Sequence, residues 1–296
     1  MLHISRRHLL VGMTAAAATL AFGADRRQAN EIMEVGKLEA ALGARIGLWV
    51  MDTETRETWA HRATERFPLC GTYKLIACAA LLARADQGKV DLWSRIAVEE
   101  ADLLPSSPVT RHHVGKDSLT LAQLCEAALA QNDHTAGNFI LQRVGGPQGV
   151  TLFMRDQGDS ASRSDRPSPA VMEAHAGDPR DTTTPRAMGE HLKALLFGPT
   201  LSPASRRLLL AWLLANRTGD DRLRARLPAG WIVGDKTAVG GNGTLNDVAV
   251  IWPPNHKPLI ASVFVTSAPA DIDRRNAVVA EIGSRLPSLL LKRGTA

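Results

Sequence analysis

The chain has 296 residues with a formal net charge of +5, and 45% of its residues are apolar. This size suits one compact domain of two lobes, or two small domains, with a sizeable core. The small positive excess is spread along the sequence, which argues against a dedicated nucleic-acid surface, and no repeat of solenoid or propeller spacing is present.

The first residues are typical of a targeting segment. Arg6 and Arg7 precede an uncharged run from Leu9 to about Ala24, a twin-arginine pattern too short and too rich in alanine to span a membrane stably. We predict a signal peptide over residues 1–24, a mature domain over 25–296, and export by the twin-arginine route to the periplasm or the medium. The alternative is an N-terminal core helix. No later apolar run reaches membrane length, so the mature chain is expected to stay off the membrane.

Apolar spacing predicts the elements in chain order. A helix over residues 25–42 is followed by two short strands, Arg45–Asp52 and Thr58–Arg62. The middle of the chain is predicted to be mainly helical, with helices at Lys74–Gln87, Leu119–Gln131, His134–Val144, Pro185–Leu196 and Ser202–Asn216. The last third is predicted to hold strands at Trp231–Lys236, Asp247–Trp252 and Leu259–Thr266, and a final helix from about Asp271 to Leu286.

This order predicts an α/β fold of the α+β sandwich kind. Strands at both ends should share one antiparallel sheet, because neither group alone makes a sheet large enough to pack well. The α/β lobe then covers approximately 25–65 and 215–296, the helical lobe approximately 66–214, and a ligand cleft is expected between them. The polar stretch 158–184 is long for a structureless connection, which marks it as a candidate functional loop.

Several motifs resemble those of class A serine β-lactamases, which are penicillin-recognising serine enzymes. The run Arg66–Lys74 is similar to the active-site run of this family. Further similar runs follow in the family's order, at Thr135–Asn138, Asn216–Asp220, Val233–Thr237 and Asn246–Val250. The resemblance spans nearly the whole mature chain and implies a five-stranded antiparallel sheet, covered by the terminal helices and packed against a helical lobe.

The chain has three cysteines, Cys70, Cys78 and Cys125. From the residues alone, they fit three buried thiols, although export would permit a disulfide. The resemblance implies a structural disulfide between Cys78 and Cys125.

Family members work by acyl transfer through S-x-x-K, S-D-N and K-T-G motifs and a loop glutamate. The resemblance places Gly71 at the nucleophile, Asn132 at the proton shuttle and Ser168 at the deacylation base. Glycine offers no attacking atom, asparagine has no hydroxyl, and a serine hydroxyl does not accept a proton near pH 7. Met172 stands where an amide would hold the water, and Ser106 where an aromatic side chain would wall the site.

Other family positions keep their expected chemistry. Arg166 and Asp181 are expected to form the ion pair of the loop, and Asp133 is expected to cap or scaffold. The expected ligand-binding residues are Lys74, Lys236, Thr237, Arg222 and the backbone N–H groups of Gly71 and Val239. Two of them have plainer alternatives, because Lys74 could pair with a nearby polar group and Arg222 could be a solvated surface arginine.

Three hypotheses follow for function. The first is a monomeric, catalytically inactive β-lactamase-like protein without cofactor or metal. The second is a module that binds a β-lactam or a cell-wall peptide, both anionic small molecules, without cleaving it. The third is residual class A activity, with candidate nucleophiles at Thr72, Ser106, Ser107 and Cys70. A metal site from His112, His113, Asp133 and His134 does not match a standard ligand spacing. Losses that fall together on the nucleophile, proton shuttle, base, water holder and aromatic wall fit both a natural pseudoenzyme and a deliberate ablation.

Overall fold

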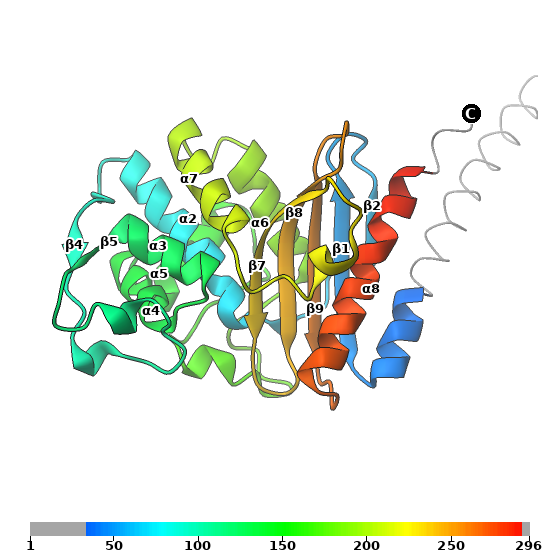
Figure 1. Ribbon diagram of the computed structural model, residues 1–296, viewed down its shortest axis with the longest axis horizontal. Coiled ribbons are helices and arrows are strands. Elements are labelled where there is room, and N and C mark those ends of the chain that lie inside the picture. Colours follow the sequence, from blue (N-terminus) through cyan, green and yellow to red (C-terminus); the bar gives the residue numbers. More distant parts are fainter. Residues whose placement is uncertain (1–33, 292–296) are drawn as a thin grey trace, which may run out of the picture.

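The computed structural model describes residues 34–291 and is built around one five-stranded antiparallel sheet (Figure 1). The strand order is β2-β1-β9-β8-β7. The bounds are Arg45–Asp52 for β1, Thr58–His61 for β2, Ile232–Val239 for β7, Leu245–Trp252 for β8 and Leu259–Thr266 for β9. The first and last strands pair along their whole length, from Arg45 opposite Thr266 to Asp52 opposite Leu259. The predicted fold class and the shared sheet are confirmed.

The central strands are covered on both faces. All eight residues of β9 are buried, and their sequence is mostly apolar rather than alternating, with Ser262 and Thr266 as its polar residues. One face packs against the helical residues 34–42 and against α8 (Ile272–Leu291), which lie together on one side of the sheet (Figure 1). The other face meets α6 (Pro185–Phe197) at close range. A Cβ added at Gly189 of α6 would lie 2.3 Å from the Trp49 ring, so this contact requires glycine.

The helical lobe surrounds α2 (Tyr73–Asp86), whose first ten residues are buried. Around it lie α3 (Leu121–Ala130), α4 (His134–Arg143), α5 (Gly146–Asp156) and α7 (Pro203–Leu214). Side chains of Thr120, Asp133, Thr184 and Ser202 each accept an N–H at the start of a helix, which satisfies donors that the helix leaves free. Sequence reasoning did not predict α5, because it begins with Gly146-Pro147-Gln148-Gly149, a run typical of a loop.

The long connection 158–184 is held by short elements rather than left irregular. Strand β6 (Thr182–Thr183) pairs with β3 (Phe67–Pro68), and a 3-10 turn, η4, covers Ala170–Met172. The expected ion pair is present, with Arg166 Nε 2.6 Å from Asp181 Oδ2. The other carboxylate oxygen of Asp181 accepts the backbone N–H groups of Asp165 and Arg166, so one buried aspartate organises the start of this loop.

The remaining short elements lie outside the main sheet. Strand β4 (Arg95–Ile96) pairs with β5 (Leu119–Thr120). The other 3-10 turns are η1 (Cys70–Thr72), η2 (Glu100–Asp102), η3 (Thr110–His112) and η5 (Leu223–Arg226).

Two further sequence predictions concern the signal peptide, which the described residues do not include, and the disulfide, which the structure corrects. The predicted signal peptide lies outside residues 34–291, and within that range no helix is long and apolar enough to cross a membrane. The disulfide implied between Cys78 and Cys125 is not formed: these residues and Cys70 are buried free thiols. Burial, together with the neighbouring Cys78, raises the pKa of the Cys125 thiol well above its usual value, so this thiol stays neutral.

Candidate active site

The candidate site starts where η1 runs into α2. Gly71 lies in η1, and Lys74 lies one helical turn further on, in the first turn of α2. Both residues are buried, and Lys74 has no exposed surface. Its chain passes across α4 at Gly137, where an added Cβ would lie only 2.8 Å from Lys74 Cε. Glycine at 137 therefore provides the room in which the lysine reaches the junction of helices and sheet.

Two lysines meet at one carboxamide. Lys74 Nζ donates to the backbone oxygen of Asn132 at 2.7 Å and to its Oδ1 at 2.9 Å. Lys236 Nζ, from strand β7, donates to the same Oδ1 at 3.1 Å and to the Thr237 carbonyl at 2.6 Å. These bonds match the alternative interpretation in which Lys74 pairs with a nearby polar group. Asn132 thus bridges the helical lobe and the sheet through its side-chain oxygen.

The same carboxamide fills the space beside Gly71. A Cβ built on Gly71 would lie 2.8 Å from Asn132 Oδ1 and 3.4 Å from Ala238 Cβ. The first distance is below normal van der Waals contact, so a side chain at 71 and the present Asn132 position exclude each other. Asn132 has a φ of 56°, in the left-handed region that asparagine tolerates better than most residues.

Burial lowers the pKa values of the basic side chains in this site. Desolvation, with the positive Lys236 nearby, holds the pKa of Lys74 well below its usual value. Desolvation and the Arg222 cation lower the pKa of Lys236 to about 7. Desolvation and Lys74 also lower the pKa of His134 to about 4, so this imidazole is neutral at pH 7. The cluster therefore carries less positive charge near neutral pH than its composition suggests.

Asp133 is fully engaged in scaffolding. Its carboxylate accepts the N–H of Ala136, as the N-cap of α4, and the N–H groups of Val109 and Thr110, each at 2.9 Å. This agrees with the expected capping role. Within residues 34–291, no group of three or more His, Cys, Asp or Glu side chains is placed to hold a metal ion.

Ser168 faces the site from the 158–184 loop. Its hydroxyl lies 3.2 Å from the Tyr73 hydroxyl, and the residue is 3% exposed. The Asn138 side chain brackets its backbone, donating to the Ser168 carbonyl at 2.9 Å and accepting its N–H at 3.0 Å. Met172 anchors the middle of the loop, because its carbonyl accepts the N–H of Gly241 at 2.7 Å. The loop thus closes against both α4 and the end of β7.

Arg222 does not lie at the protein surface. Its guanidinium donates to the carbonyls of Ala238 at 3.1 Å and Asn246 at 2.8 Å, and the residue is 6% exposed. The alternative of a solvated surface arginine is therefore wrong. The Thr237 hydroxyl is buried and bonded to the Thr218 hydroxyl. Of the expected ligand-binding residues, Lys74 and Lys236 meet at Asn132, whereas Arg222 braces β7 against β8, and Val239 is exposed at the end of β7.

The alternative nucleophiles are mostly enclosed. Thr72 donates its hydroxyl to the Leu69 carbonyl at 2.6 Å, and the Ser107 hydroxyl bonds that of Thr135 at 2.8 Å. Burial raises the pKa of the Cys70 thiol to about 12, which keeps it protonated and unreactive. Ser106 is exposed, with a φ of 62°. Among these four residues, only Ser106 has its side chain open to solvent.

Three contributing residues were not predicted from sequence. Asn138 holds Ser168, Tyr73 meets its hydroxyl, and Thr218 binds Thr237. Asn138 and Tyr73 lie inside runs that carried the resemblance, so their presence in those runs was the available signal. Their partners are 30 and 95 residues away along the chain, which no local pattern reports.

The sheet, the helical lobe and the two lysines at their junction define a penicillin-recognising serine-enzyme fold. Residues 27–289 match the model of the "Beta-lactamase enzyme family". β-Lactamase PSE-4 of Pseudomonas aeruginosa is 39% identical over 274 residues, 93% of this chain and 95% of the relative. β-Lactamase Toho-1 of Escherichia coli is 40% identical over 276 residues, 93% and 94% of the two chains. An ancestral class A β-lactamase structure superposes with a TM-score of 0.86 at 50% identity, over 88% of this chain and 99% of that one. The chain therefore belongs to the class A β-lactamase family.

Proposed function

We propose that this chain is a β-lactamase family member that does not hydrolyse β-lactams. The observation that carries the proposal is the position of Asn132 Oδ1, which would lie 2.8 Å from any Cβ at residue 71 and already receives both lysines. Where the family's serine would present its oxygen, this chain has a glycine and, beside it, a carboxamide that is a poor nucleophile. Without an attacking oxygen, the covalent bond of the acyl-enzyme intermediate cannot form.

The release step lacks its base as well. Ser168 stands at the position that the resemblance gives to the glutamate, and its hydroxyl is paired with Tyr73. Burial raises the pKa of Tyr73 well above its usual value, so this pair offers no proton acceptor near pH 7. Loss of the nucleophile alone costs on the order of 10⁶ in turnover in a serine hydrolase, and further losses in the same unit add little.

The test compares the purified parent with restored variants. The parent is expected to show no penicillin hydrolysis and no mass increase after incubation with penicillin. The double variant Gly71→Ser/Asn132→Ser is expected to gain the mass of one penicillin without fast turnover. Adding Ser168→Glu and Met172→Asn is expected to restore hydrolysis. Hydrolysis or an adduct in the parent, persisting through exhaustive purification, would refute the proposal.

A second candidate function is non-hydrolytic binding of an anionic lactam or cell-wall peptide. Its support is the convergence of Lys74 and Lys236 on one uncharged oxygen, an arrangement in which a carboxylate would be a better acceptor. Calorimetric titration with benzylpenicillin tests it, with Lys236→Gln as the variant expected to lose binding. No heat and no thermal shift at millimolar penicillin would remove this candidate.

We also propose that residues 1–24 direct export by the twin-arginine route and that the mature chain is a monomer of two lobes. The support for export is the Arg6-Arg7 pair before an uncharged run. Replacing both arginines with lysine is expected to leave the protein in the cytoplasm of the expressing cell, as cell fractionation would show. Light scattering of the purified mature chain tests the monomer.

A further inference from the structure

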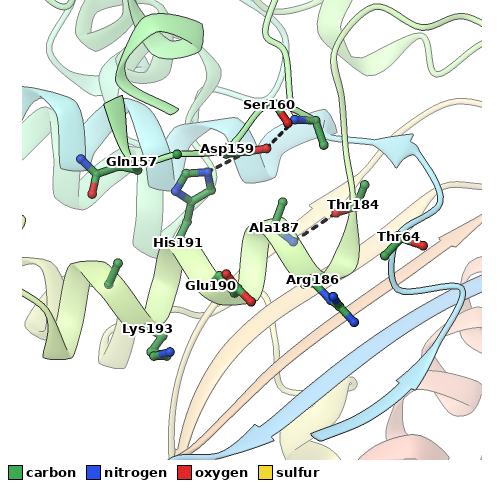
Figure 2. Close-up of a pocket in the computed structure, with 13 residues that line it drawn as sticks. Thr64, Gln157, Asp159, Ser160, Thr184, Arg186, Ala187, Glu190, His191 and Lys193 are labelled. Carbon is green, nitrogen blue, oxygen red and sulfur yellow. Dashed lines mark hydrogen bonds and ion pairs between the residues drawn. The ribbon is translucent and has the colours of Figure 1, made fainter. Parts of the chain in front are cut away.

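The structure has a cavity whose lining residues include none of those that form the lysine site. It measures about 400 Å³ and opens between α6 and the segment 157–161 (Figure 2). This volume lies in the range of small-molecule sites, about 300–1,000 Å³. Thr64 and Thr184 also contribute to its lining.

An aspartate–histidine pair joins the two walls of the cavity. His191 Nε2 lies 2.9 Å from Asp159 Oδ2, and the two side chains are 3% and 7% exposed. In Figure 2 the His191 ring reaches from α6 toward Asp159 on the facing segment. Burial raises the pKa of Asp159, but hydrogen bonds from His191 and Ser162 outweigh it and hold that pKa well below its usual value. Asp159 is therefore a carboxylate at neutral pH.

The second nitrogen of the His191 ring has no partner within residues 34–291. A carboxylate only accepts hydrogen bonds, so Nε2 carries the proton that points at Asp159. In the neutral ring, Nδ1 is then a hydrogen-bond acceptor. A nearly buried imidazole with one unused ring nitrogen thus lines the cavity, and in its neutral form that nitrogen suits a ligand with an N–H or O–H donor.

Three charged residues of α6 line the same cavity. Arg186, Glu190 and Lys193 are exposed, and their side chains form no ion pair or hydrogen bond with any other residue that the structure describes. Figure 2 shows them in sequence along the helix, with Glu190 between the two cations. At a helical rise of 1.5 Å per residue, they are spaced by about 6 and 4.5 Å along the axis. The α6 wall therefore presents positive, negative and positive charges in order, with a net charge of one positive unit. The Asp159 carboxylate on the facing segment is already bound by His191 and by the N–H groups of Ala161 and Ser162.

We propose that this cavity binds a small amino dicarboxylate, such as a short acidic peptide with a free amine. Its ammonium group would face Glu190, and its two carboxylates would face Arg186 and Lys193. A peptide N–H would donate to His191 Nδ1. Such a molecule carries one net negative charge, which complements the charge of the α6 wall, and charge complementarity of this kind sets specificity more than affinity.

The dipeptide alanyl-glutamate is the probe, measured by calorimetry at low ionic strength with the mature chain. Alanyl-glutamine removes one carboxylate, and N-acetyl-alanyl-glutamate removes the ammonium group. Each is expected to bind about fivefold more weakly, the size expected for a partly exposed ion pair. Equal affinity of all three peptides, or no binding by alanyl-glutamate, would overturn the proposal.

Matched variants locate the binding. Glu190→Gln and Lys193→Gln remove one charge each from the cavity wall, at exposed positions where folding should be unaffected. Glu126→Gln on α3 and Arg207→Gln on α7 remove the same charges at exposed positions that do not line the cavity. We expect about fivefold weaker binding of alanyl-glutamate for the first two variants and unchanged binding for the controls. Equal losses in all four variants would show a general charge effect and refute a site here.

Discussion

Gly71 and Asn132 should be energetically coupled, and a double-mutant cycle measures this. Gly71→Ser alone places a Cβ 2.8 Å from Asn132 Oδ1, so the carboxamide must move away from two lysines. Overpacking of this kind costs about 1–3 kcal/mol. Asn132→Ser alone removes the acceptor that both lysines share, which costs about 1–3 kcal/mol because buried donors lose a partner.

The double variant should be more stable than the sum of the single changes implies. Once Asn132 is shortened, the side chain introduced by Gly71→Ser has room, and its hydroxyl can accept from Lys74. We expect a favourable coupling energy of about 1–2 kcal/mol, within the range for residues in contact. Serine is less suited than asparagine to the φ of 56° at residue 132, but this penalty occurs in both variants that carry the change and cancels in the cycle.

The assay is equilibrium unfolding in urea of the parent, the two single variants and the double variant. The control cycle pairs Gly71→Ser with Asn255→Ser, because Asn255 is exposed and also has a φ of 56°. That cycle should be additive within about 0.5 kcal/mol. Additivity in the Gly71/Asn132 cycle as well would refute the reasoning that the carboxamide takes the space of the missing side chain.

Three further perturbations have expected outcomes. Gly137→Ala puts a Cβ 2.8 Å from Lys74 Cε and 2.9 Å from the Tyr73 hydroxyl, so urea unfolding should show a loss of about 1–3 kcal/mol; no loss would mean that Lys74 moves freely. Asp181→Asn breaks the buried pair with Arg166, so it should cost about 3 kcal/mol and expose the 158–184 loop to limited proteolysis. Asp220→Asn, in an exposed pair with Arg224 outside the loop, should do neither. The pKa of His134 is about 4 in the folded chain, below its usual value of 6.5, so the unfolded chain takes up this proton at higher pH than the folded chain does. The free energy of unfolding should therefore fall as the pH drops from about 6.5 to 4. His134→Asn should flatten that pH dependence in urea unfolding, and an unchanged slope would contradict the shifted pKa.

The sequence predicts the sheet well, because its strands are short segments rich in apolar residues and their position at both chain ends leaves few arrangements. The Arg166–Asp181 pair was also predictable, because the resemblance to the family implied it. The helix α5 was not predictable, because it begins with glycine and proline and only two of its residues, Val150 and Met154, are buried. The helix was missed because the residues of its first turn are ones that usually form loops.

The interior of the site was beyond sequence reasoning for a different reason. Asn132 contacts Lys74 and Lys236 across 58 and 104 residues of chain, and no spacing rule reports such a meeting. The burial of Arg222 depends likewise on two strand carbonyls that only the assembled sheet brings together. The resemblance named these residues, but their partners came from tertiary packing.

The pairing of β1 with β9 has a consequence for how the polypeptide reaches its native state. Two strands made at the start of synthesis gain their central neighbour only when residues 259–266 emerge, late in the chain. Contacts so distant along the chain slow folding, because a large loop must close before they form. A nascent chain halted before β9 would present one bare edge of β1, a template for pairing with other chains. Ribosome-stalled fragments ending before residue 259 should therefore be sensitive to protease and bind chaperones, and release of the remaining residues should protect the whole sheet at once.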